Sequence, residues 1–361
     1  MTAPTIHLVY PDGPAISCPD AIGRNLRERL SESYPVRTYT WDDRSTVRPA
    51  HGDILIGHPH PNPCTVFRRS LHLPGWKRIL MLCPYAHGDL RQVAMWDTVI
   101  PRCDAFLAIT GRYWFETMPT SAFAHWYPRT VHMDLAVDRG DFPFIKQRFN
   151  PPGQRKFLYI GSKIWLKNTT YISELARRLP GTTFRWIGSG RGGIKGVESL
   201  GQRLFSDATT QRLVADHDFL ISVGRSDANP ATILESMSWG LIPVCTPQSG
   251  YVNYASIPNV PLDQPDTAAA VLQHLQQLSE HDLAAMQVAN HRLLDEHFNW
   301  DRFNRQVVSA IESTARPALG VEPSMRKIRL RWSALTSPYA PWHPLNVARR
   351  TARTLLGPPR S

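Results

Sequence analysis

The chain has 361 residues, 42% hydrophobic and 20% charged, a balance that fits globular proteins and excludes a disordered chain. The formal net charge of +11 is concentrated at the C-terminus, where residues 316–361 hold nine Lys or Arg and one acid, Glu322. The rest of the chain is nearly neutral. Because a nucleic-acid binder carries its positive charge on the folded surface, we expect no nucleic-acid partner.

The five cysteines, at positions 18, 64, 83, 103 and 245, are odd in number and form no C-x-x-C pair. This pattern favours free thiols in a reducing compartment over a disulfide or metal framework. The N-terminus lacks the basic flank and long apolar core of a signal peptide, and no apolar run reaches about 18 residues. We therefore expect a cytoplasmic protein.

Short apolar runs alternate with helix-compatible stretches along the N-terminal part of the chain. Strands are predicted at 5–10, 52–57, 78–83 and 104–109, and helices at 21–30, 64–71, 89–98 and 111–118. Such alternation predicts an α/β fold with a parallel sheet and helices on both faces.

Residues 134–156 are rich in charge, Pro and Gly, as in an interdomain linker. The alternation then restarts, and from 266 to 313 the pattern is helical, with Asp266 and Ser279 as predicted N-caps. The strands are predicted at 157–160, 183–187, 219–223 and 241–246, and the helices at 169–179, 207–215 and 231–239. We predict an N-terminal domain over 1–138, a linker over 139–155, a second domain over 156–298, a last helix over 299–315 and a tail over 316–361.

The tail is basic and rich in proline. Leu345, Ala348, Ala352 and Leu355 share one helical face beside three arginines. Such a stretch fits an anionic membrane surface, which would place the protein on the inner face of the membrane. A loosely packed tail explains the pattern equally well.

The strand–turn–helix pattern at 219–244 carries two acids, Asp227 in the turn and Glu235 on the helix. A carboxylate among apolar helix residues is costly unless it is paired, so we expect Glu235 to face a cleft and to accept the hydroxyl protons of a ribose. The helix N-terminus at 229–232 offers N–H groups to a phosphate. For an isolated pair of acids, helix capping and solvent exposure are the ordinary alternative.

A second cationic feature is the loop G-S-K-I-W-L-K-N after the predicted strand 157–160. It holds Lys163 and Lys167, two of only seven lysines in the chain. A cationic loop beside a helix N-terminus suits a pyrophosphate, whereas the loop alone would be taken as a solvated basic segment.

Together these motifs resemble those of the retaining GT-B glycosyltransferases of family four. Its E-x7-E element is present as S-D-A-N-P-A-T-I-L-E-S-M-S-W-G-L-I-P-V, and its phosphate loop as G-S-K-I-W-L-K-N. Four further segments match in order: D-L-A-V-D-R-G-D-F at 134–142, W-I-G-S-G at 186–190, V-E-S-L-G at 197–201 and F-N-W at 298–300. The resemblance spans about residues 1–313 and is closest over 134–300.

The resemblance implies a GT-B architecture, with two Rossmann-like, doubly wound parallel-sheet domains facing a cleft and a C-terminal helix that crosses back. It implies transfer of a sugar from a nucleotide-diphosphate sugar to a carbohydrate or lipid-linked acceptor. It further implies retention of configuration and no need for a metal or other cofactor. The donor would bind mainly to 157–255 and the acceptor mainly to 1–135.

By the same resemblance, Glu235 binds the ribose, Asp227 contacts the donor sugar and phosphates, and Lys167 neutralises the departing diphosphate. His87, after the strand at 78–83, is the expected cleft histidine, a role for which His58 and His60 compete. The remaining residues expected at the nucleotide sugar are Gly13, Ser162, Lys163, Gly188, Asn229 and Gly250. The H-x-H pair with Cys64 lacks a fourth zinc ligand, so we expect no metal.

The chain departs from the family pattern at three places. Asp227 replaces a glutamate, Ser162 replaces an arginine, and P-Q-S-G-Y-V-N replaces G-G-x-x-E. These departures leave two alternatives open. One is a degenerate GT-B protein that binds sugar nucleotides as a scaffold. The other is a module that binds an anionic membrane or nucleic acid through its tail.

Overall fold

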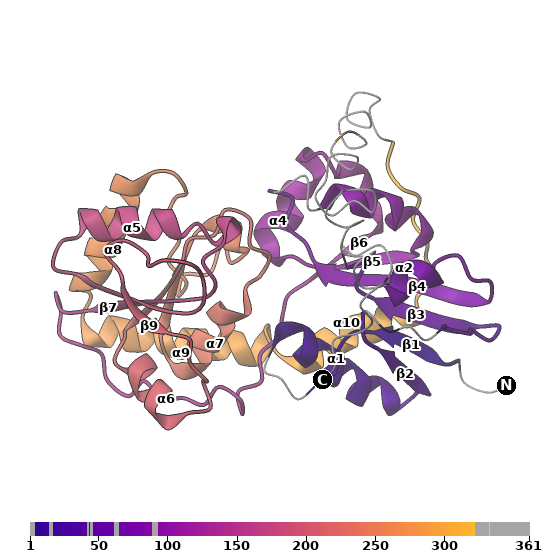
Figure 1. Ribbon diagram of the computed structural model, residues 1–361, viewed down its shortest axis with the longest axis horizontal. Coiled ribbons are helices and arrows are strands. Elements are labelled where there is room, and N and C mark those ends of the chain that lie inside the picture. The colour runs from indigo at the N-terminus through magenta and orange to yellow at the C-terminus, as the bar shows by residue number, and fades with distance from the viewer. Residues whose placement is uncertain are drawn as a thin grey trace. The chain divides into compact units, whose positions relative to one another are not determined.

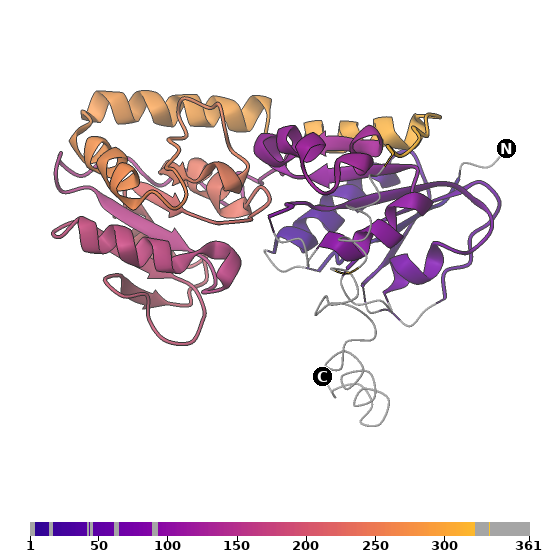
Figure 2. The ribbon, with the colours of Figure 1, turned by 90° about the horizontal axis from the view of Figure 1, so that it is seen from above.

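The computed structural model describes residues 4–13, 17–41, 43, 46–60, 65–88, 93–321 and 332. The described chain forms two compact units (Figures 1 and 2). The first takes the chain up to Ile109, Thr117–Met133 and the chain from Asn304 onward. The second takes Thr110–Glu116 and Asp134–Phe303.

The first unit is built on a sheet of six parallel strands in the order β2-β1-β3-β4-β5-β6. Its strands β3 and β5 are buried at every residue, as expected for parallel strands covered on both faces. The strand bounds are β1 Ile6–Val9, β2 Val36–Tyr39, β3 Asp53–Gly57, β4 Trp76–Pro84, β5 Ala105–Ile109 and β6 Thr130–Met133.

Helices and 3-10 turns connect these strands. Helix α1 (Cys18–Ser31) buries Ile22, Leu26 and Leu30, which confirms its predicted apolar face. The other connecting elements are α2 Val66–Ser70, η1 Ala94–Thr98, η2 Ile100–Arg102, α4 Gly111–Thr117, η3 Met118–Thr120 and η4 Ala124–Arg129.

The second unit is built on five parallel strands in the order β11-β10-β7-β8-β9. Phe219, Phe157 and Phe184 lie in register across its three central strands, with ring centroids 4.9 and 5.1 Å apart. The strand bounds are β7 Lys156–Ile160, β8 Thr183–Ile187, β9 Glu198–Gly201, β10 Phe219–Ser222 and β11 Ile242–Cys245.

The helices of the second unit cover both faces of its sheet. Helices α5 (Thr169–Arg178) and α8 (Pro265–Gln277) lie side by side (Figure 1). Their buried side chains share a hydrophobic cluster with the phenylalanine row, so both helices pack on that face of the sheet. Helices α7 (Ala231–Trp239) and α9 (Glu280–Glu296) pack against each other, and α6 (Ala208–Ala215) connects β9 to β10.

The observed helix ends follow local sequence signals. Helix α7 has the predicted bounds and ends at Gly240, which adopts the left-handed φ of 92°. Ser279 caps α9 through a capping box, as predicted. The prediction that Asp266 caps α8 is wrong, because α8 begins at Pro265 and Asp266 lies within its first turn.

The last helix, α10 (Trp300–Glu312), begins in the second unit, and the chain from Asn304 belongs to the first. Two parallel-sheet α/β units followed by C-terminal helices confirm the predicted fold class. Within the described part of the chain, no helix combines the length and the apolar character needed to cross a membrane. Most of the predicted basic tail, 322–331 and 333–361, lies outside the described residues.

Candidate functional site

The candidate site lies at the carboxyl ends of the strands in the second unit. The chain enters this sheet at β7, adds β8 on one side and later adds β10 on the other, so the strand order reverses between β7 and β10. Ligands of open α/β sheets bind outside the carboxyl ends at such a switch point. The loops at 161–168 and 223–230 follow these two strands and carry most of the predicted site residues.

Two predicted catalytic residues meet at this switch point. Lys167 Nζ lies 2.6 Å from Asp227 Oδ2, and both side chains are partly exposed. The two loops are joined by a hydrogen bond from Arg225 N to the carbonyl oxygen of Leu166, at 2.9 Å. The structure therefore presents an ammonium–carboxylate pair to solvent at the edge where a ligand is expected.

Glu235 lies on α7 and is half-buried. Burial raises the pKa of its carboxyl to about 7, while the positive charge of Lys167 lowers it. Among the described residues, no donor hydrogen-bonds to this carboxylate. A half-buried acceptor that the described chain leaves unpaired suits a ligand that donates hydroxyl protons.

Asn229 shapes the turn before α7. Its backbone is left-handed, with φ of 49°, and its Oδ1 accepts a hydrogen bond from Leu135 N at 2.5 Å. Its Nδ2 is buried and has no hydrogen-bond partner among the described residues. The residue predicted to bind the nucleotide sugar therefore also fixes the backbone that leads into the α7 N-terminus.

The two predicted site glycines of this unit allow loops to pack closely. A Cβ atom at Gly188 would lie 1.9 Å from the carbonyl oxygen of Gly161. Gly250 has a left-handed φ of 93°, and a Cβ there would lie 3.2 Å from the Cα of Gly111. Both positions require glycine for backbone packing, independently of any ligand.

Ser162 and Lys163 occupy the rim of the loop after β7. The backbone oxygen of Ser162 accepts a hydrogen bond from the Tyr159 hydroxyl at 2.8 Å. Lys163 Nζ donates to the carbonyl oxygens of Arg191 at 3.4 Å and Gly193 at 2.8 Å. The two lysines of the loop thus have different partners. Lys163 contacts the loop after β8, and Lys167 pairs with the carboxylate of Asp227.

Gly13 and His87 belong to the first unit and follow β1 and β4. Gly13 N donates to Asp20 Oδ1 at 3.1 Å. His87 Nε2 lies 3.3 Å from Thr117 Oγ1, and burial lowers the pKa of its imidazole to about 4, so the ring is neutral at pH 7.

The competing histidines belong to an aromatic cluster in the first unit. The ring of His60 stacks on Trp41, with centroids 4.7 Å apart, and His58 packs between Trp41 and Tyr10. Burial lowers the pKa of His58 to about 3. Among the described residues, no group of three or more His, Cys, Asp or Glu is placed to hold a metal. Cys64 lies outside those residues.

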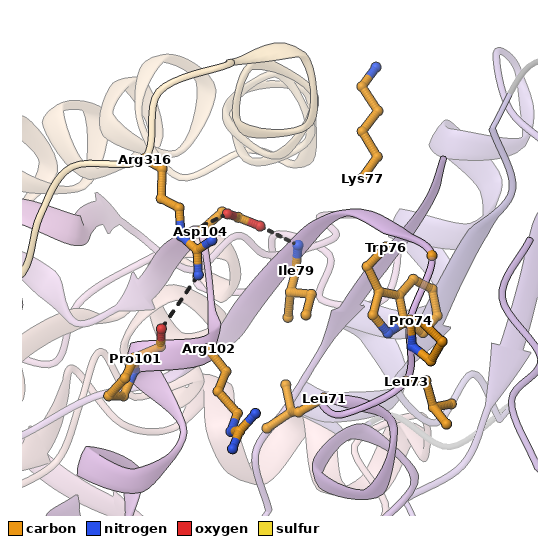
Figure 3. Close-up of a pocket in the computed structure, with 11 residues that line it drawn as sticks. Leu71, Leu73, Pro74, Trp76, Lys77, Ile79, Pro101, Arg102, Asp104 and Arg316 are labelled. Carbon is orange, nitrogen blue, oxygen red and sulfur yellow. Dashed lines mark hydrogen bonds and ion pairs between the residues drawn. The ribbon is translucent and has the colours of Figure 1, made fainter. Parts of the chain in front are cut away.

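Two of the cavities formed by described residues bear on where the site lies. One, of about 290 Å³, borders the loop after β7 and is lined in part by Trp165, Asn168 and Arg225, which the sequence motifs did not single out. The other, of about 480 Å³, lies in the first unit at the amino ends of β4 and β5 (Figure 3). There Arg316 pairs with Asp104 at 3.2 Å. Because it lies at the opposite strand ends from those that bind ligands, it is not part of the candidate site.

No protein-family model and no curated protein matches the chain. Several solved structures share its fold. One is an alpha-glucosyltransferase in complex with UDP and DNA, 11% identical, with a TM-score of 0.60 over 86% of this chain and 100% of its own. HepE from Anabaena, in complex with UDP and glucose, is 12% identical, with a TM-score of 0.59 over 86% of this chain and 100% of its own.

A third structure, TarM, is 10% identical with a TM-score of 0.54, covering 72% of this chain and 55% of its own. The chain has the GT-B fold. At 10–12% identity this likeness concerns the fold alone.

Proposed function

We propose that this GT-B protein is a retaining glycosyltransferase that transfers a sugar from a nucleotide-diphosphate sugar to a carbohydrate or lipid-linked acceptor. One observation carries the proposal: the Lys167–Asp227 pair, at 2.6 Å, lies at the sheet switch point on the unit that also holds Glu235 unpaired. Structural neighbours bound to UDP or UDP-glucose support a nucleotide-sugar donor.

Each residue has a proposed role. The Glu235 carboxylate accepts the hydroxyl protons of the ribose, and the N–H groups at the start of α7 receive a phosphate. Lys167 neutralises the charge that develops on the diphosphate as the bond to the sugar breaks. Asp227 holds the Lys167 ammonium in place and faces the donor sugar. We propose that these groups act by charge and positioning, without a metal.

His87 remains a proposed catalytic residue. The low pKa of its imidazole keeps the ring neutral at pH 7, so the ring is able to hydrogen-bond a sugar hydroxyl without adding charge.

The proposal is tested by calorimetry with UDP and by turnover of a panel of UDP-, GDP- and ADP-sugars. Glu235→Ala should abolish donor hydrolysis and transfer. Lys167→Met should weaken UDP binding about 10- to 100-fold, because a charge-assisted hydrogen bond is lost. Lys195→Met, at an exposed lysine of the same unit, is the matched control and should bind UDP normally. If the native chain neither binds any nucleotide diphosphate nor turns over any donor, the proposal is wrong.

The second candidate is a scaffold that binds sugar nucleotides without turnover. Ser162 in place of an arginine favours it, because the loop then offers one cation fewer to a diphosphate. UDP binding without turnover of any donor would select the scaffold over the enzyme. Deletion of 322–361 tests the remaining alternative, in which the tail docks the protein on an anionic membrane: liposome binding should be lost and UDP binding kept.

A further inference from the structure

The 290 Å³ cavity beside the loop after β7 shares Lys163 with the residues expected at the nucleotide sugar. It is lined by Trp165, Asn168 and Arg225, and by Thr169 and Thr170 at the amino end of α5. Lys163 also lines it, whereas Lys167 and Asp227 do not. The cavity therefore offers room for a group that does not contact the Lys167–Asp227 pair.

The cavity carries excess positive charge. Lys163 donates only to backbone carbonyls, and within the described chain no carboxylate pairs with it. Arg225 Nη1 lies 3.2 Å from Asp263 Oδ1, on an aspartate that is well exposed, so the solvent screens this neutralisation. The first turn of α5 has no side-chain cap, and its N–H groups add a positive dipole end. The cavity is therefore bordered by two cations and a helix N-terminus but by only one carboxylate, and this balance favours the binding of an anion.

Asn168 supplies an independent sign of a ligand. It lines the cavity, is 3% exposed and adopts a left-handed φ of 53°. Its Oδ1 accepts from Arg225 Nε at 3.0 Å and from Thr170 Oγ1 at 3.3 Å, which assigns the other amide atom as the donor Nδ2. That Nδ2 has no hydrogen-bond partner among the described residues. A buried donor without a partner destabilises the folded chain, a cost that a bound acceptor would remove.

The same cavity has an apolar wall. Trp165 is 64% exposed and the adjacent Ile164 is 48% exposed, although both are large apolar residues. An exposed indole offers a flat surface on which the C–H face of a sugar ring packs, and its exposure on the free chain is otherwise unfavourable. The volume of about 290 Å³ is large enough for one sugar ring.

We propose that this cavity binds a monosaccharide unit that carries an anionic group, a carboxylate or a phosphate. The ring packs on Trp165, the anion lies between Arg225, Lys163 and the α5 N-terminus, and an oxygen of the sugar accepts from Asn168. The proposal concerns binding in this cavity and does not rest on the proposed function.

Calorimetry on the full chain tests the proposal with glucuronate, glucose 6-phosphate, glucose and inorganic phosphate. At least one anionic sugar should bind with a Kd ten or more times lower than that of glucose and of phosphate. Which of the two binds tells a carboxylate from a phosphate. Equal affinity for glucose and both anionic sugars would overturn the anionic part, and phosphate binding as tightly as the sugars would overturn the sugar part.

Variants locate the binding. Trp165→Ala and Arg225→Gln should each raise the Kd of the anionic sugar at least tenfold, and Trp165→Phe should keep most of the affinity. Val288→Ala and Arg212→Gln, at exposed positions of the same unit, are matched controls that should bind like the native chain. Unchanged affinity in both site variants would place the sugar elsewhere and overturn the proposal.

UDP titrations separate this proposal from the proposed function. If UDP binds the native chain and neither anionic sugar does, the cavity assignment is wrong and the donor site stands. If an anionic sugar binds in the Trp165-dependent manner and UDP does not bind, the cavity assignment stands and the glycosyltransferase proposal is wrong.

Discussion

Glu235 combines two properties that a single residue rarely has without a ligand: it is half-buried, and the described chain gives its carboxylate no hydrogen bond. An ionised group in this setting destabilises the folded chain, and it becomes favourable only when a donor reaches it. Its neighbour Lys167 is already engaged by Asp227 at 2.6 Å. The free chain thus pairs one of its two site acids and leaves the other for the ligand.

The raised pKa of Glu235 predicts a pH dependence of stability. Below the ordinary value of 4.5 the carboxyl is protonated in both states and contributes nothing, and above about 7 the folded chain bears the full cost of the buried charge. Glu235→Gln should therefore increase the free energy of unfolding. The increase should be near zero at pH 4.5 and on the order of 1 kcal/mol at pH 8, because partial exposure moderates the effect.

Urea unfolding at several pH values measures this difference. Glu312→Gln, at an exposed position of α10, is the control and should show no such trend. A Glu235→Gln stability difference that is flat between pH 4.5 and 8 would contradict the raised pKa.

The sequence motifs predicted the positions of single site residues but not their side-chain contacts. The positions of Asp227, Glu235 and Lys167 relative to strands and helices followed from apolar periodicity and turn residues, so the sequence placed them at one sheet edge. The pairing of Lys167 with Asp227, and of Lys163 with the Gly193 carbonyl, depends on side-chain directions that no spacing encodes. The contact between Asn168 and Arg225 could not be predicted, because the two residues are 57 positions apart in the chain.

At the scale of elements, the loops after β7 and β8 meet through Gly161 and Gly188. A methyl group at 188 would lie 1.9 Å from the backbone oxygen of Gly161, and relieving this clash would require the backbone to move. We expect Gly188→Ala to cost about 2 kcal/mol or more of stability and to weaken UDP binding, because it displaces the loop that holds Lys163 and Lys167.

Thermal unfolding and UDP calorimetry check this expectation. Gly193→Ala, in the same loop, is the matched control, because a Cβ there meets no heavy atom within 4 Å. It should change stability by less than about 0.5 kcal/mol. Similar behaviour of the two variants would show that the close approach of Gly161 and Gly188 is unimportant.

The segment at 139–155 is fixed to the second unit by a buried charge cluster. Lys146 Nζ lies 3.1 Å from Asp218 Oδ1, Arg155 Nη1 lies 3.9 Å from the same atom, and all three side chains are at most 2% exposed. Asn150 and the backbone of Lys156 also donate to this carboxylate. The segment predicted as a linker is thus held against the second unit along its length.

Neutralising one member of this cluster should be costly. Asp218→Asn leaves two buried cations without their counter-charge, so we expect a loss of about 3–5 kcal/mol in the free energy of unfolding. Asp216→Asn is the matched control: its carboxylate pairs with Lys156 and Arg185 near the surface and should contribute at most about 1 kcal/mol. Urea unfolding of the full chain measures both, and equal losses would refute the difference between buried and exposed pairs.

The elements most easily predicted were those with continuous apolar runs, such as β3 and β10, because burial on both faces leaves a clear pattern. Strands β2 and β6 were not predicted. They lie at the two edges of the first sheet, and their sequences, V-R-T-Y and T-V-H-M, mix polar and apolar residues because edge strands are only partly covered. Edge position is a property of the sheet and is not visible in four residues.

At the scale of the whole molecule, the alternation of strands and helices was enough to predict two parallel sheets, and the ordered motifs predicted the GT-B fold that the structural neighbours share. The acceptor could not be predicted in the same way. The cavity beside Trp165 could not be predicted either, because it forms between the loops after β7 and β10, which lie far apart in the sequence.

The way in which the chain is divided between the two units has a consequence for folding during synthesis. The second unit includes Thr110–Glu116, where Trp114 Nε1 donates to the Gln248 carbonyl at 2.9 Å. The first includes the chain from Asn304, where Gln306 Nε2 donates to the His132 carbonyl at 3.2 Å. A ribosome delivers these segments in order, so the N-terminal sheet emerges first yet lacks its last helix until more than 300 residues have been made. The second unit has all of its residues once Phe303 has been made, whereas the first cannot complete its fold until the chain from Asn304 has followed.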